Sequence, residues 1–162
     1  GSLHNKVVQT IAKAGVEADC LVECYNFRGV GQSQGVFDHG HGERYDLKAV
    51  LSFAIERWGQ RALVLAGFSF GAWVSSLVAD AISPVRMVLI APPVSLYPME
   101  RLVLPAVPLT VIQGGQDEVV SSEQALSWAK SQSADVLWRA QAGHYFHGQL
   151  LWLRRAALLA LS

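Results

Sequence analysis

Apolar residues follow two alternating patterns along this chain. In some stretches they recur three and four positions apart, as on one face of a helix, and in others they form short continuous runs typical of buried strands. The helical spacing predicts helices at residues 4–14, 43–58, 70–82, 122–132 and 150–161. The continuous runs predict strands at residues 20–27, 62–66, 85–91, 109–115 and 135–140. Three boundaries also carry local signals, namely Gly59, the Ser83-Pro84 pair and a capping box that begins at Ser121.

Strands that alternate with helices predict an α/β fold, with a mostly parallel sheet and helices on both of its faces. The chain has 162 residues, of which 51% are hydrophobic, so it can bury the core of one domain spanning residues 1–162. In open sheets of this class, ligands bind beyond the C-terminal ends of the strands. Functional side chains are therefore expected in the loops that lead from a strand to the next helix.

Composition narrows the class of partner. Thirteen basic and thirteen acidic side chains leave no net charge, so neither nucleic acid nor a membrane surface is favoured, and a small molecule is expected instead. No apolar run reaches the roughly 18 residues that a membrane span needs. Cys20 and Cys24 would lie about 13 Å apart on a strand, which is too far for a disulfide. Two buried, reduced thiols are expected, and they suit a cytoplasmic protein.

The motif Gly67-Phe68-Ser69-Phe70-Gly71 lies between a predicted strand and a predicted helix. A serine on so sharp a turn needs flanking glycines, because a side chain there would collide with the strand or the helix. This placement favours Ser69 as a nucleophile over an ordinary turn serine. A serine hydroxyl also needs a base to accept its proton and an acid to orient that base.

Two later strand-to-helix loops supply the acid and the base. Asp117 follows the fourth predicted strand and His144 follows the fifth, so the order along the chain is Ser, Asp, His. Glu118 is the alternative acid and His147 the alternative base. A turn or helix-capping role also stays open for Asp117.

Two further histidines, His39 and His41, lie in a Gly-rich segment before a predicted helix. Such spacing is more typical of a turn than of a metal site, and no other ligand lies nearby in the sequence. Neither a metal nor a cofactor is expected.

Seven segments span nearly the whole chain, and in chain order they are NKVVQT, NFRGVGQSQG, FDHGHGE, AGFSFGAW, APPV, GGQDEVV and GHYFHG. Together they resemble the α/β-hydrolase superfamily, and more narrowly the small bacterial hydrolases related to dienelactone hydrolase. The resemblance implies a catalytic triad of Ser69, Asp117 and His144, with the backbone N–H of Phe70 as one oxyanion donor. It implies a serine hydrolase acting on a small-molecule acyl substrate, either a carboxylic ester or a thioester, with amide cleavage as the second chemistry.

Aromatic residues flank the predicted site. Phe68 and Tyr145 are expected to contact the substrate, although plain packing is the alternative for both. The segment between Val94 and Val107, where larger members of the superfamily insert a lid, is short, so a shallow and open site is expected. The sequence leaves open whether the protein forms a homodimer.

The beginning of the chain departs from the family pattern. Members normally have further strands before the first helix and a loop that supplies a second oxyanion N–H, and we expect both to be missing here. The strand predicted at residues 20–27 should then lack a neighbour between itself and the strand at residues 62–66. A hydrolase-like scaffold that binds a partner without turnover is therefore the second functional hypothesis.

Overall fold

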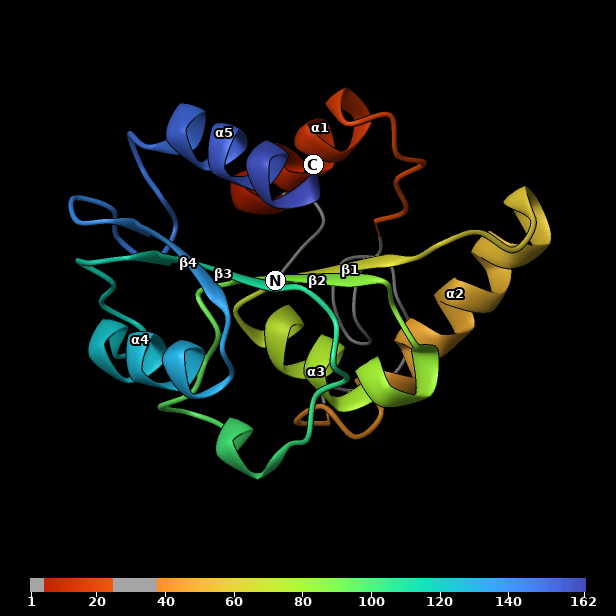
Figure 1. Cartoon of the computed structure of the whole chain (residues 1–162), viewed down its shortest axis with the longest axis horizontal. Coiled ribbons are helices and arrows are strands. Elements are labelled where there is room, and N and C mark those ends of the chain that lie inside the picture. Colours follow the sequence, from red (N-terminus) through yellow and green to blue (C-terminus); the bar gives the residue numbers. More distant parts are fainter. Residues whose placement is uncertain (1–4, 25–37) are drawn as a thin grey trace.

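The computed structural model describes residues 5–24 and 38–162, and its elements form a sheet between two layers of helices (Figure 1). The strands are β1 (Val64–Phe68), β2 (Arg86–Ile90), β3 (Leu109–Gly114) and β4 (Asp135–Arg139). The helices are α1 (Lys6–Glu17), α2 (Glu43–Trp58), α3 (Phe70–Ile82), α4 (Ser122–Ser131) and α5 (Leu150–Leu161), with a short 3-10 helix η1 (Met99–Arg101). In these residues the sheet is parallel throughout, in the order β1-β2-β3-β4, which confirms the predicted α/β class.

The helices cover the two faces of the sheet in pairs. Figure 1 shows α1 and α5 on one face, and α3 and α4 on the other. Alternate residues of β3 divide accordingly. Ile112 belongs to the same buried cluster as Val7 of α1 and Leu153 of α5, whereas Val111 belongs to the cluster that contains Trp73 of α3 and Trp128 of α4. Because both faces are covered, the central strands are buried on both sides, and this explains their continuous apolar runs.

The prediction of a strand at residues 20–27 is wrong for residues 20–24, the part that the structure describes. Residues 20–24 belong to no ladder, and residues 25–27 lie outside the described residues. The backbone N–H of Cys20 donates to the carbonyl of Gly15 at 2.9 Å, and a Cβ on Gly15 would lie only 2.8 Å from Val22. The segment therefore packs along α1, so no ladder joins its described part to β1. The Gly-rich segment at residues 26–35 also lies outside the described residues.

Helix α2 begins and ends as predicted, with Gly59 at φ 76° after its last turn. Its predicted apolar face includes Leu47 and Ile55, and that face is not buried as a whole, because Leu47 is buried while Ile55 is 39% exposed. Figure 1 shows that α2 extends outward past the β1 edge of the sheet. The C-terminal half of α2 therefore contributes little to the core of the described residues.

Candidate active site

Ser69 occupies the sharp turn between β1 and α3. Its backbone has φ 54° and ψ −117°, a conformation that L-residues seldom adopt and that costs about 1–3 kcal/mol. The Ser69 N–H donates to the carbonyl of Ile90 at 2.8 Å, which ties the turn to β2. A Cβ on Gly67 would lie 2.5 Å from the carbonyl oxygen of Gly71, so the predicted steric reason for glycine holds at Gly67. The turn therefore presents the Ser69 side chain at the carboxyl edge of the sheet.

The loops after β3 and β4 run side by side. The backbone N–H of Gln116 donates to the carbonyl of Ala142 at 2.9 Å, and that of Gly115 donates to the carbonyl of Arg139 at the same distance. A Cβ on Gly114 would collide with the carbonyl oxygen of Ala142. Glycine at this place lets the two backbones approach closely, and their approach brings Asp117 and His144 together.

The three predicted triad residues form one hydrogen-bonded chain. The His144 ring lies with Nδ1 at 2.8 Å from Asp117 Oδ2 and with Nε2 at 3.0 Å from Ser69 Oγ. The side chains of His144 and Asp117 are only 2% and 0% exposed. An ionised carboxylate only accepts hydrogen bonds, so Nδ1 carries the proton and Nε2 offers its lone pair to the serine hydroxyl. This is the arrangement that a general base needs.

Four hydrogen bonds hold the carboxylate of Asp117. Oδ1 accepts from the backbone N–H groups of Val119 and Val120, each at 2.8 Å, and Oδ2 accepts from His144. The fourth donor, to Oδ2, is Nε2 of Gln113 at 3.2 Å. Burial by itself raises the pKa of Asp117. The hydrogen bonds from His144, Val120 and Val119 lower that pKa by more than burial raises it, so the net shift is downward. Asp117 is therefore ionised at neutral pH, and its turn role coexists with its contact to His144.

The alternative acid, Glu118, and the alternative base, His147, are outside the hydrogen-bonded chain of Ser69, His144 and Asp117. Glu118 Oε2 accepts from the backbone N–H of His144 at 3.2 Å, so it holds the main chain of that residue while Asp117 holds the ring. His147 is exposed, with its ring 6.0 Å from that of Tyr145. The geometry therefore favours Asp117 and His144 over both alternatives.

Two aromatic rings lie beside the imidazole of His144. The rings of Phe68 and Tyr145 lie 5.0 Å and 4.9 Å from the imidazole, and 5.9 Å from each other. Tyr145 is 42% exposed, so one side of this cluster faces solvent. The two residues predicted to contact substrate thus lie beside the predicted base.

A second aromatic group lies at the start of α3, where Tyr97, from the segment between β2 and η1, contacts two rings of the helix. Tyr97 lies 5.8 Å from Phe70 and stacks on Trp73 at 5.1 Å between ring centroids. Burial, and then the charge of Glu43, raise the pKa of Tyr97. Trp73 lies one helical turn after Ser69 and is buried in the core, so its stacking with Tyr97 is part of the packing beneath the start of α3.

The segment that holds His39 and His41 is a turn, as predicted. Buried Glu43 accepts from the backbone N–H groups of Asp38 and Gly40 at 2.6 Å and 2.9 Å. The carbonyl of His39 accepts from the indole of Trp73 at 3.2 Å. Within residues 5–24 and 38–162, no group of three His, Cys, Asp or Glu side chains could hold a metal ion.

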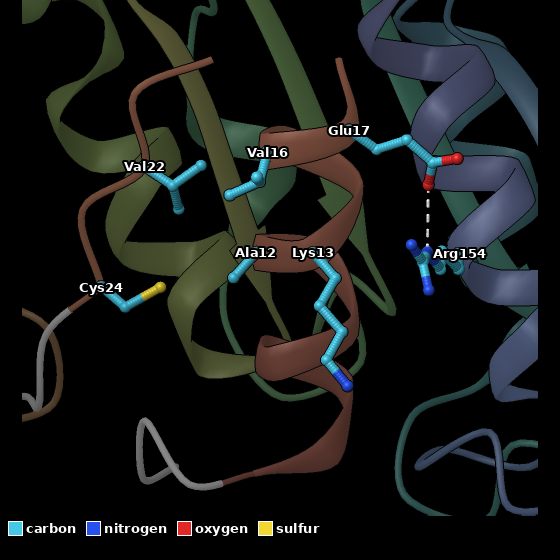
Figure 2. A pocket seen from close by; sticks show the side chains of 7 residues that line it. All are labelled: Ala12, Lys13, Val16, Glu17, Val22, Cys24 and Arg154. Carbon is cyan, nitrogen blue, oxygen red and sulfur yellow. Dashed lines mark hydrogen bonds and ion pairs between the residues drawn. The ribbon is translucent and has the colours of Figure 1, made fainter. Parts of the chain in front are cut away.

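A groove of about 680 Å³ lies between α1, α5 and residues 20–24 (Figure 2). Figure 2 shows Val16, Val22 and Cys24 on one side of α1, and the Glu17–Arg154 ion pair, at 3.0 Å, on the other. None of its lining residues belongs to the predicted triad.

The two cysteines differ from their predicted burial. Cys20 is half-buried and Cys24 is exposed, so the prediction of two buried thiols is wrong. The reason is that their segment packs on α1 at the surface instead of joining the sheet. Partial burial, and then the charge of Glu23, raise the pKa of Cys24.

In the described part of the chain, none of the helices combines the length and apolar character that crossing a membrane requires.

Comparisons with known proteins place the chain among hydrolases. It is 39% identical to an α/β serine hydrolase without a lid from Xanthomonas campestris, with a TM-score of 0.94 over 99% of this chain and 74% of that one. It is 41% identical to an α/β serine hydrolase homologue from Coxiella burnetii, with a TM-score of 0.94 over 100% of this chain and 79% of that one.

A third relative is an uncharacterised protein of Rickettsia prowazekii, 38% identical over 129 residues, or 76% of this chain. The match spans 54% of that relative, about half its length. No family model matches the chain. The identity to the two solved hydrolases, together with the shared fold, shows that the chain belongs to the α/β-hydrolase superfamily, beside the small bacterial serine hydrolases.

Proposed function

We propose that this protein is a serine hydrolase that cleaves a carboxylic ester or thioester of a small-molecule acyl substrate. The observation that carries the proposal is the unbroken chain from Ser69 Oγ through the His144 ring to the buried carboxylate of Asp117. Serine hydrolases among its relatives support the same reading.

The chemistry follows from these contacts. Ser69 Oγ attacks the carbonyl carbon while His144 Nε2 accepts the hydroxyl proton, and the imidazolium that forms is stabilised by Asp117. His144 then gives that proton to the departing alcohol or thiol, which leaves an acyl group on Ser69. A water molecule, deprotonated by the same nitrogen, attacks the acyl carbon. The tetrahedral intermediate that results then collapses, which releases the carboxylic acid, and His144 returns the proton to Ser69 Oγ.

The developing oxyanion needs hydrogen-bond donors. The backbone N–H of Phe70 is our candidate because Phe70 is the first residue of α3 and directly follows the nucleophile. The positive end of the helix dipole lies at the same place, which favours negative charge there. Phe68 and Tyr145, which flank His144, are the proposed substrate contacts.

The test uses a fluorophosphonate probe on the full-length protein. We expect the wild type to be labelled on Ser69 and the Ser69→Ala variant to be silent. The matched control is Ser76→Ala, which removes another buried hydroxyl of α3, bonded to the Ala72 carbonyl at 2.7 Å, and should leave labelling unchanged. Labelling that maps to a residue other than Ser69, or no labelling of folded wild type, would overturn the proposal.

A panel of p-nitrophenyl esters and acyl thioesters then identifies the substrate class. Hydrolysis of either type should fall by roughly 10⁴- to 10⁶-fold in Ser69→Ala, the range seen when a triad member is removed. A preference among acyl chain lengths would measure the size of the acyl site.

A further inference from the structure

We propose that Gln113 is a positioning residue that fixes the carboxylate of Asp117 and limits the charge it offers to His144. This inference rests on the proposed function, and it concerns a residue that the sequence did not single out. Gln113 lies near the end of β3, four residues before Asp117.

The side-chain amide of Gln113 spans two acceptors. Its Nε2 lies 3.2 Å from Asp117 Oδ2 and 2.9 Å from the carbonyl oxygen of Gly114. Both partners can only accept, so the NH₂ group and not the amide oxygen must face them. The oxygen of Asp117 that Gln113 contacts is the one that also accepts from His144 Nδ1.

The position is an unusual place for a polar side chain. All six residues of β3 are buried, and Gln113 is 0% exposed. Its Oε1 is buried and has no hydrogen-bond partner among the described residues. A buried, unpaired amide oxygen destabilises a fold, and an apolar residue would avoid that cost. Departures of this kind from the local pattern are expected where a residue serves a function, and here the amide holds Asp117.

The shared oxygen makes the two donors competitors. Each hydrogen bond to Oδ2 withdraws part of its negative charge, so Gln113 makes the carboxylate less basic toward the His144 ring. The backbone bonds from Val119 and Val120 hold the other oxygen, so Gln113 also completes the restraint on carboxylate rotation. Without Gln113, Asp117 should rotate more freely and hold the imidazolium more strongly.

The test compares Gln113→Met with wild type in full-length protein, using p-nitrophenyl acetate. Methionine keeps the length of the side chain and removes its donors. We expect kcat/KM near neutral pH to fall about tenfold, because a carboxylate that rotates more freely no longer keeps the His144 ring aligned with Ser69, a loss comparable to that of one hydrogen bond to a charged group. We also expect the acid limb of the kcat/KM profile to move to higher pH, a change that belongs to the coupled Asp117–His144 pair.

The matched control is Val111→Ala, two residues earlier on the same face of β3 and outside the predicted triad. It should lower the melting temperature and leave the pH midpoint of the acid limb in place. Equal midpoints in Gln113→Met, Val111→Ala and wild type would overturn the inference, because a merely structural role predicts that result.

A second variant and a second readout keep the test decisive. Gln113→Glu has the same shape but donates only when protonated, so it should lose activity as pH rises and the new charge faces Asp117. The low-field proton NMR signal of His144 Nδ1–H needs no turnover: a change in Gln113→Met supports the inference, and an unchanged signal contradicts it. If the fluorophosphonate probe fails to label Ser69 in wild type, only the proposed function is contradicted. The NMR result still decides whether Gln113 positions Asp117.

Discussion

Glu118 accepts a hydrogen bond from the backbone N–H of His144 at 3.2 Å, while its neighbour Asp117 accepts one from the ring of the same histidine at 2.8 Å. Two adjacent carboxylates thus hold the main chain and the side chain of one residue. A Cβ on Gly143 would lie 2.9 Å from Glu118 Oε2, so the loop fits closely around the Glu118 carboxylate. The division of roles between Asp117 and Glu118 can be tested directly.

Glu118→Ala should lower kcat/KM by about three- to tenfold, because one hydrogen bond that positions the His144 loop is lost. Glu118→Gln should stay near wild type, since its amide oxygen can still accept from the His144 N–H. Asp117→Asn, in contrast, should cost about 10⁴-fold, as loss of the ring-orienting carboxylate does in serine proteases. Steady-state kinetics on p-nitrophenyl acetate measures all three. A large loss in Glu118→Gln would make Glu118 the acid.

Gly114→Ala should lower both activity and stability. The new methyl group would meet the backbone of Ala142, which cannot move without separating the loops that carry Asp117 and His144. We expect a loss of about 1–3 kcal/mol in the free energy of unfolding, measured by urea denaturation. The control is Gly148→Ala, where nothing lies within 4 Å but φ is 72°, so a strain of only about 1 kcal/mol and normal activity are expected. Similar activity in the two variants would contradict this account.

The helix α3 could be predicted from the sequence to the residue, because strong local signals stand at both ends. Ser69 on its turn and the Ser83-Pro84 pair bound residues 70–82 in the structure as in the prediction. The proximity of Ser69, Asp117 and His144 likewise followed from the fold class, since parallel strands bring their carboxyl ends to one edge. Both predictions rest on information that is local or fixed by the fold class.

Contacts that neither composition nor spacing encodes were harder to predict. Residues 20–24 have the composition of a strand, but a strand exists only with a hydrogen-bonded neighbour, and composition does not reveal one. Gln113 was visible as a polar residue within the apolar run LTVIQGG. Its contact with Asp117 depends on side-chain direction at the strand end, which spacing alone does not give. The same reason hid the bond from Glu118 to the His144 backbone.

Arg86 should stabilise the fold through the end of α5. Its Nη1 donates to the carbonyl oxygens of Ala160 and Ser162, each at 2.8 Å, and its charge favours the negative end of the helix dipole. Arg86→Met should therefore reduce the free energy of unfolding by about 1–2 kcal/mol. The control is Arg154→Met, which breaks the Glu17 ion pair, whose side chains are 44% and 46% exposed. Exposed pairs contribute under about 1 kcal/mol, so equal losses in the two variants would refute the capping role of Arg86.

The depressed pKa of Asp117 predicts how stability depends on pH. Its pKa in the folded protein lies below the ordinary value of 3.8, so the folded state binds this proton less readily than the unfolded state does. Stability from the ionised carboxylate is then fully present above the unfolded pKa and is lost as pH falls through the folded pKa. The loss should begin below about pH 5 and continue toward the acid end.

Urea denaturation of wild type and Asp117→Asn between pH 7 and pH 2.5 measures this contribution. In wild type, Asp117 should add up to about 1.4 kcal/mol per pH unit to the slope of unfolding free energy in the acid range, the value for one proton. Below about pH 5, that part of the slope should be missing in Asp117→Asn. His144→Ala removes the largest of the hydrogen bonds that lower the pKa, so its slope should lie between the other two. Superimposable slopes for wild type and Asp117→Asn below pH 4 would show that the hydrogen bonds to Asp117 do not favour its ionised form.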